Sequence, residues 1–213
     1  MAASDTLIFI AREIIQFYYG GQVLTFSPPA GVIKDLEVVD GDAFKAGLAV
    51  FMDENRIIPG DSGVLLSESV CFISEPVLKD QNSEKALADF LSALPFESPV
   101  ARIFGDKIVG TNRDLYQAVN EVVGQKGGKI KMVSPSFLSR ETFDKRQLDG
   151  DLVKFVLANE DEFAKATFDY EAALPIATGT QPQTKKGSKR TTILVAVFAV
   201  LLVILIWLLT TLS

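Results

Sequence analysis

Apolar and polar positions alternate in short groups along the first part of the chain, and this pattern predicts strands there rather than long helices. Residues 7–10 and 14–19 are rich in β-branched and aromatic side chains. Gly20 and Gly21 form a tight-turn signal before a third short apolar run at 23–26. The sequence therefore predicts that the chain opens as a three-stranded meander.

Three later segments carry apolar residues at spacings of three and four, the period of a helix with one buried face. The first helix is expected between Asp40, its N-cap, and Asn55, the second over 83–94 and the third over 113–125. The three apolar faces consist of Phe44, Leu48, Phe51 and Met52; of Ala86, Leu87, Phe90, Leu91 and Leu94; and of Leu115, Val119, Val122 and Val123.

Further strands are predicted between and after these helices, and the segment 136–170 is expected to be mostly helical. The predicted strands are 64–66, 70–73, a hairpin of 100–104 and 107–109, and 129–133. Strands in groups that alternate with helices predict a mixed domain of the α+β or α/β-like class, with helices packed on at least one sheet.

The end of the chain has a different pattern. Over 175–190 the apolar periodicity gives way to Thr, Gly, Gln and Lys, so this segment is expected to be a flexible basic linker. Residues 193–209 contain no charged side chain, and a helix over 191–212 would reach the roughly 30 Å thickness of a bilayer core. The anchor positions singled out in this predicted transmembrane helix are Ile193, Leu201, Leu205, Trp207 and Leu209.

A basic collar directly precedes the predicted transmembrane helix and consists of Lys185, Lys186, Lys189 and Arg190. Because cationic flanks stay on the cytoplasmic side of a membrane, residues 1–174 are expected to form a cytoplasmic domain. The chain is therefore predicted to be a single-pass, tail-anchored membrane protein that contacts the lipid bilayer through its C-terminal helix.

Composition narrows the chemistry that the domain can perform. Of the 21 basic residues four form the collar, which leaves 17 against 27 acidic residues, a net charge of −10. Such a field repels phosphate backbones, so nucleic-acid binding is not expected. The chain has no histidine and one cysteine, which excludes Ser-His-Asp and Cys-His catalysis and an internal disulfide. Cys71 is expected to be a small core residue, and residues 61–63 to form a turn.

Two other motifs have both a structural and a chemical interpretation. Residues 124–129 superficially resemble a phosphate-binding loop, but they follow a helix and precede a strand, which favours a helix C-cap. Asp40, Asp42, Asp149 and Asp151 are expected to lie at helix starts as capping carboxylates, and they leave open the alternative of a carboxylate-based magnesium-dependent hydrolase. Nothing assembles a nucleophile, a base and an oxyanion hole, so no catalytic, cofactor-binding or metal-ligating residue and no cofactor is predicted.

The order of segments resembles a known family. Residues 26–40 read FSPPAGVIKDLEVVD and precede the predicted helix 43–54, which looks like PilM-type pilus assembly ATPases and the related cell-division protein FtsA. The helix 83–94, the turn at Pro95 and Phe96, two short strands and the run GGKIKMVSP at 127–135 are similar to the family's small subdomain and its return to the main sheet. The resemblance implies a partial actin-like, ribonuclease H-like fold with a small inserted strand-helix-strand-strand subdomain over about 30–112.

The departures from that family imply a lost activity. The family's first hairpin carries an Asp-x-Gly phosphate-binding turn, whereas residues 9–13 here read FIARE, and the second half of the fold has no room before 175. By this resemblance, also to the cytoplasmic domain of GspL-like type II secretion proteins, the chain is expected to be a non-enzymatic adaptor or scaffold in type IV pilus, type II secretion or envelope assembly. Its expected partner is another membrane protein with a short cytoplasmic segment, and its expected location is the bacterial inner membrane. A tail-anchored trafficking protein is the second alternative.

Overall fold

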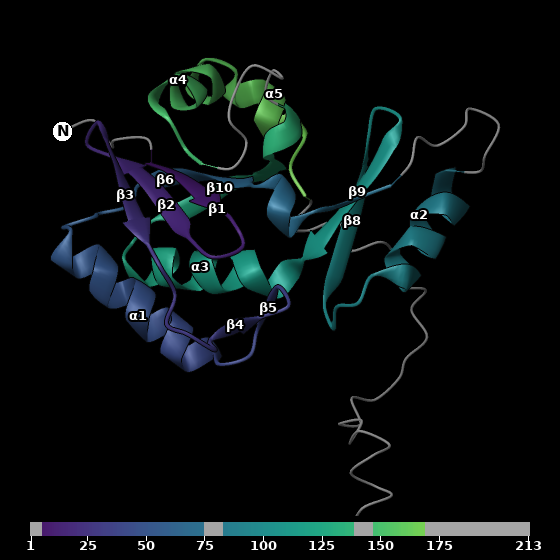
Figure 1. The fold of residues 1–213 in the computed structure, drawn as a ribbon. Coiled ribbons are helices and arrows are strands. Elements are labelled where there is room, and N and C mark those ends of the chain that lie inside the picture. Colours follow the sequence, from purple (N-terminus) through teal and green to yellow (C-terminus); the bar gives the residue numbers. More distant parts are fainter. Residues whose placement is uncertain (1–5, 75–82, 139–146, 169–213) are drawn as a thin grey trace, which may run out of the picture. The chain divides into compact units, whose positions relative to one another are not determined.

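The fold is given by a computed structural model that describes residues 6–74, 83–138 and 147–168. A five-stranded sheet forms its centre, with strand order β10-β6-β1-β2-β3 (Figure 1). β1, β6 and β10 run parallel, and β2 runs antiparallel to its neighbours β1 and β3. The five strands are β1 (Thr6–Ile10), β2 (Ile15–Tyr19), β3 (Gln22–Phe26), β6 (Asp61–Leu66) and β10 (Lys129–Pro135).

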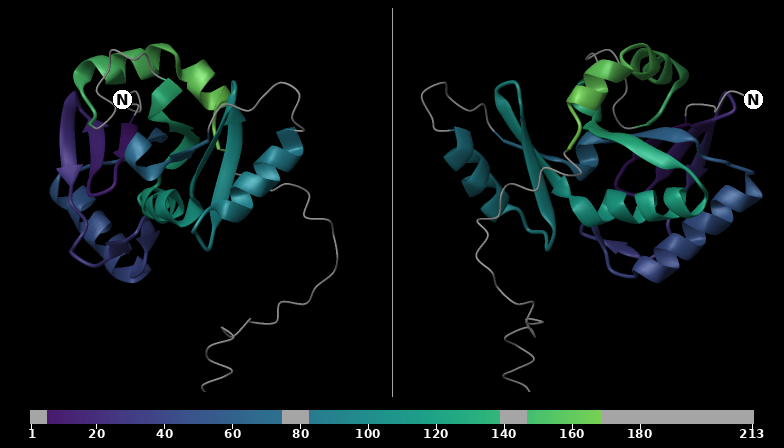
Figure 2. Two further views of the ribbon diagram at one scale, coloured as in Figure 1. Left: turned by 45° about the vertical axis from the view of Figure 1, so that its right-hand side comes forward. Right: turned by 180° about the vertical axis from the view of Figure 1, so that it is seen from behind.

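Helices cover both faces of this sheet. α1 (Gly41–Glu54) and α3 (Arg113–Gln125) pack against each other on one face, and α4 (Gly150–Ala158) and α5 (Glu160–Lys165) lie over the other (Figures 1 and 2). Since α1 and α3 lie in the crossover connections β3 to β6 and β6 to β10, they connect strands along the sheet as in α/β folds.

The alternation of side chains along β1 explains why this strand reads as an unbroken apolar run. Ile8 and Ile10 belong to the core with α1 and α3, whereas Leu7 and Phe9 belong to a second core with α4 and α5. Successive residues of a strand point to opposite faces, so a central strand covered on both faces has no polar side. The mixed sheet with its parallel strands fits the expected partial actin-like fold.

A second, three-stranded sheet has the order β7-β9-β8 and is antiparallel throughout. Its strands are β7 (Phe72–Ile73), β8 (Pro99–Phe104) and β9 (Lys107–Asn112), and α2 (Ser83–Ala93) packs on it. Gly105, with φ 64°, makes the turn of the predicted β8–β9 hairpin. Two short 3₁₀ turns, η1 (Glu68–Val70) and η2 (Ser136–Leu138), follow β6 and β10.

A two-stranded hairpin of β4 (Ile33–Lys34) and β5 (Glu37–Val38) precedes α1. Its turn residues Asp35 and Leu36 have φ of 50° and 66°, which is the left-handed region that a two-residue hairpin requires. Leu36 is buried, and its carbonyl oxygen accepts a hydrogen bond of 3.1 Å from Nδ2 of Asn112. Burial and this bond hold a bulky residue in a conformation that it otherwise disfavours.

The structure confirms the predictions of an N-terminal meander, of three helices and of the β8–β9 hairpin. Asp40 caps α1 through a hydrogen bond of 3.0 Å from the amide of Ala43 to its Oδ1, and Asn55 is the C-cap. Gly20 and Gly21 make the β2–β3 turn with φ of 58° and 80°. These features are local, since each depends on residues within one turn or one hairpin of each other.

Two predictions need correction. The strand expected at 70–73 is only β7, because Ser67 caps the 3₁₀ turn η1 and draws Val70 into it. The expected turn at 61–63 is the beginning of β6, which pairs with β1 and β10 on its two sides. The apolar face predicted for α2 is its partly buried face, since Phe90 and Leu91 pack against the first core.

Candidate functional site

The edge strand β7 exposes two large apolar side chains. Phe72 and Ile73 are each 41% exposed, and β7 pairs on one side with Gly110 and Val109 of β9. Within the described residues no strand pairs with the other side of β7, which is an edge of its sheet. The ring of Phe72 packs edge-on against Phe96 at a centroid distance of 5.4 Å, so it is held in place while partly facing solvent. An edge strand of this kind has backbone groups to which a strand of another chain can pair.

Helix α2 lies close to the same sheet at Gly110 of β9, which has no side chain. A Cβ atom added to Gly110 would lie 2.6 Å from Cδ1 of Leu94 and 2.8 Å from Cε1 of Phe90. Gly110 therefore permits the helix and the residue that follows it to sit directly on β9. Because α2 buries no complete side chain, it covers the sheet only in part.

The first hairpin, where the family resemblance implies a lost phosphate-binding turn, is closed by its own backbone. The amide of Ala11 donates to the carbonyl of Ile14 at 2.9 Å, and the amide of Arg12 donates to Oγ of Ser69 at 3.2 Å. Ser69 in turn donates to Oγ of Ser67 at 3.0 Å. Serine hydroxyls thus connect the residues that follow β1 with those that follow β6. Ligands bind at the carboxyl ends of such strands in many α/β folds.

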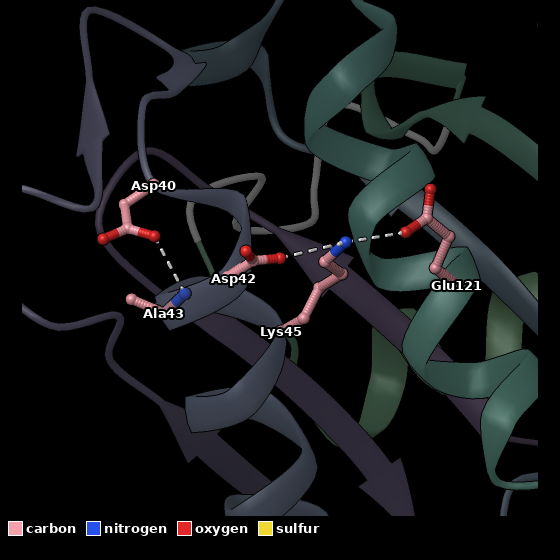
Figure 3. Close-up of polar contacts among 5 residues, drawn as sticks. All are labelled: Asp40, Asp42, Ala43, Lys45 and Glu121. Atoms are coloured by element: carbon pink, nitrogen blue, oxygen red, sulfur yellow. Dashed lines mark hydrogen bonds and ion pairs between the residues drawn. The ribbon is translucent and has the colours of Figure 1, made fainter.

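Figure 3 shows the carboxylates at the start of α1. Lys45 lies between Asp42, at 3.8 Å, and Glu121 of α3, at 3.1 Å, and so joins the two helices. The hydrogen bond with Glu121 and its negative charge raise the pKa of Lys45 above its ordinary value, with a smaller contribution from Asp42. Asp40 serves as the helix cap. These side chains therefore act in capping and in pairing two helices.

Asp149 performs the same capping function for α4. Its Oδ1 accepts hydrogen bonds from the amides of Asp151, at 3.0 Å, and Leu152, at 2.7 Å, while Asp151 lies 3.6 Å from Nζ of Lys154. Since α1 and α4 lie on opposite faces of the sheet, the two aspartate pairs are not brought together (Figure 1). Within the described ranges, no three or more His, Cys, Asp or Glu side chains are placed to hold a metal ion. The clustering that the magnesium alternative requires is therefore contradicted.

The phosphate-loop-like segment at 124–129 is a helix C-cap, as predicted. Lys126 is the C-cap of α3, and Gly127 follows with φ of 82° while the amide of Gly128 donates to the carbonyl of Val123 at 2.9 Å. The ammonium group of Lys126 is paired with Asp53 of α1. The lysine thus ties two helices together at this end, as Lys45 does at the other.

Cys71 packs against the first core as a half-buried residue, which agrees with the predicted role as a small apolar side chain. Desolvation by the surrounding side chains, assisted by the charge of Glu68, raises the pKa of the Cys71 thiol to about 12. Such a thiol is not a nucleophile at neutral pH, because the reactive form is the thiolate.

The predicted anchor residues 191–212 and the basic collar at 185–190 lie outside the described residues. In the part of the chain that the structure does describe, no helix is both long and apolar enough to span a membrane. The membrane anchor and the orientation that the collar implies therefore stay predictions from the sequence.

The sequence analysis missed two features of the small sheet. Phe72 and Ile73 were expected in a strand over 70–73, and they lie exposed in the shorter edge strand β7. Ser67, whose side chain caps the 3₁₀ turn η1, is the signal that could have revealed the shorter strand. The contacts of Arg102 with the end of α5 join residues more than 60 positions apart, and no local signal indicates them.

No protein-family model matches the chain, and neither does any curated protein sequence. Solved structures that are similar to part of this chain include three different proteins. A PilM-PilN type IV pilus biogenesis complex aligns with a TM-score of 0.40 at 11% identity, covering 62% of this chain and 47% of that one. The cytoplasmic domain of EpsL, an inner membrane component of the type II secretion system of Vibrio cholerae, has a TM-score of 0.37 at 13% identity, covering 64% and 60%.

The third is a protein from Bacteroides thetaiotaomicron with an actin-like ATPase fold and unknown function, with a TM-score of 0.34 at 12% identity over 62% of this chain and 52% of that one. The chain thus spans about half the length of these structures. All three TM-scores lie below 0.5.

Proposed function

We propose that this chain is a non-enzymatic, membrane-anchored adaptor that holds a protein partner at the cytoplasmic face of a membrane. The observation that carries the proposal is the uncharged run 193–209 directly after the basic collar. An uncharged apolar segment of that length is favourable in a bilayer and costly in water. The domain before it, linked through 175–190, would then work within reach of the membrane surface.

The folded domain supports the adaptor role through its small sheet. Phe72 and Ile73 expose apolar surface on a strand edge, to which an extended segment of a partner can add by backbone hydrogen bonds. The net charge of −10 before the collar favours a partner segment that is basic. The proposed partner is therefore a membrane protein with a short basic segment next to its own span, and tethering both proteins to one membrane raises their effective concentration.

The assembly systems in which we place this role are type IV pili, type II secretion and related envelope assemblies, and the bacterial inner membrane is the proposed location. This finer part rests on the sequence resemblance of residues 26–54 and 83–135 to PilM-type proteins. The closed first hairpin at Ala11 and Ile14 is consistent with a protein that has given up the family's nucleotide site.

The anchor is tested in cells with the full chain. Leu201→Lys combined with Leu205→Lys places two charges at the centre of the predicted span, each costing about 2.5–3.5 kcal/mol on insertion scales. The chain should then move from the membrane pellet to the soluble fraction after alkaline carbonate extraction. Thr184→Lys, in the linker, is the control and should leave the chain in the pellet. Retention of the doubly charged variant in the membrane, or extraction of the native chain by carbonate, would contradict the proposal.

Partner binding is tested separately by co-purification from detergent-solubilised membranes. Phe72→Asp and Ile73→Asp should each weaken recovery of the partner, because a charge placed on the apolar docking edge must be desolvated when the partner binds. Val50→Asp is the matched control, since Val50 is 55% exposed on α1, away from β7. Equal loss of the partner in all three variants would show that β7 is not the docking edge.

A further inference from the structure

The last described residues, 165–168, run from the end of α5 along the main sheet. The amide of Phe168 donates to the carbonyl of Val133 in β10 at 2.7 Å, and the amide of Val133 donates to Oγ1 of Thr167 at 2.8 Å. Phe168 is buried in the first core. This segment, called the exit segment, follows α5 and is attached to β10 by these hydrogen bonds.

Strand β8 of the small sheet holds the same segment from the other side. Nη2 of Arg102 donates to the carbonyl of Lys165 at 2.9 Å, and Nη1 donates to the carbonyl of Thr167. The ring of Phe104 packs edge-on against Phe168 at a centroid distance of 5.4 Å. Figure 1 shows the yellow-green end of the chain after α5 passing beside this hairpin. The guanidinium thus bridges two carbonyls at the C-terminal end of α5, where the helix dipole is negative.

The contacts of Arg102 and Phe104 lie near the turn of the β8–β9 hairpin, whereas other contacts hold the opposite end of β9. At the far end of β9, Thr111 donates to the carbonyl of Val70 at 2.8 Å and Asn112 to that of Leu36 at 3.1 Å, which fixes the base of the small sheet. Arg102 and Phe104 lie in the half of β8 next to the turn, where Phe104 pairs with Lys107. The turn end of the sheet is therefore attached to the main body through the exit segment and through Phe137 of η2, which also packs on Phe104.

We propose that Arg102, Phe104 and the exit segment form a clasp that couples the end of α5 to the small sheet. A change in the segment at 165–168 loosens the attachment of the β8–β9 hairpin and changes the orientation of the sheet. The reverse also holds, because coupling between two sites is reciprocal: an occupant that moves the hairpin changes how tightly the chain is held at its exit. The inference concerns contacts inside the described domain and is independent of the membrane anchor and of any partner.

The coupling is tested by hydrogen exchange on the full chain in detergent, with one variant on each side of the clasp. Arg102→Gln removes the two carbonyl contacts from the sheet side, and Phe168→Leu perturbs the ring contact from the exit side. Each variant should speed exchange in both segments, 100–109 and 160–168, by about tenfold, as loss of one charge-assisted hydrogen bond would give. Lys131→Gln is the control, because it removes an exposed pair with Asp61 on the main sheet and should change neither segment.

Exchange in β1 and α3 serves as the internal reference for folding, since both are covered by the first core. If Phe168→Leu speeds exchange at 160–168 while 100–109 keeps its native rate, the two segments are not coupled and the inference is wrong. If Arg102→Gln affects only β8 and β9, the arginine is a local contact of the hairpin and the inference is likewise wrong. Loss of the anchor or of the partner in the experiments above would leave this result unchanged.

Discussion

Replacing Gly110 by alanine should displace α2 from the small sheet while leaving the main body intact. The added Cβ would meet Leu94 and Phe90 at 2.6 and 2.8 Å, and the backbone carbonyl of Val100 at 3.3 Å. Real Cβ atoms essentially never come within 3.0 Å of another heavy atom, so the side chains of Leu94 and Phe90 must shift. Insertion of a methyl group into a packed site typically costs about 1–3 kcal/mol, and because α2 is only partly buried, we expect the helix to move together with these side chains.

The assay combines urea unfolding with hydrogen exchange of the folded chain. We expect exchange in α2 to rise by about ten- to a hundredfold, the equivalent of about 1.4–2.8 kcal/mol, with little change in α1 and β1. The matched control is Gly124→Ala in α3, where an added Cβ meets nothing within 4 Å. That variant should raise the free energy of unfolding by up to about 1 kcal/mol, because alanine is the better helix former. Unchanged exchange in α2 of Gly110→Ala would refute the close approach of α2 to β9.

Three other predictions concern a helix cap, the single thiol and nucleotide. Asp149→Ala should lower the free energy of unfolding by about 1 kcal/mol, because two amides of α4 lose their acceptor, and Asp151→Ala, which removes an exposed ion pair, should cost less in the same denaturation assay. The Cys71 thiol should react far more slowly with a disulfide reagent at pH 8 in the folded chain than in denaturant, since a pKa of about 12 leaves about one thiolate in ten thousand. Fast labelling of the folded chain would contradict this expectation. Because the pKa is raised from 9.0 in the folded state, the contribution of the thiol to stability is complete below pH 9 and is lost as the pH rises toward 12. Calorimetry should find no binding of ATP with magnesium tighter than about 1 mM, or roughly 4 kcal/mol; micromolar affinity would show that the first hairpin has not lost the nucleotide site.

The elements that the sequence determined by itself are those whose energies are local. The cap at Asp40, the stop at Gly127 and the turn at Gly105 each depend on a few neighbouring residues, and the structure has all three. The apolar periods of α1 and α3 likewise identified buried residues such as Phe44 and Val119. The uncharged run 193–209 lies outside the described residues, so the membrane anchor that its length and composition indicate stays a prediction.

The tertiary structure alone decided which segments meet. β6 joined the main sheet between β1 and β10 because its two faces fit the two cores, although its first residues carry a turn signal. No described strand pairs with the edge on which Phe72 and Ile73 lie, and Arg102 contacts the end of α5 only because the fold brings β8 beside that distant segment. Sequence patterns report short-range propensity, whereas burial and pairing depend on contacts between residues far apart in the chain, which only the complete fold brings together.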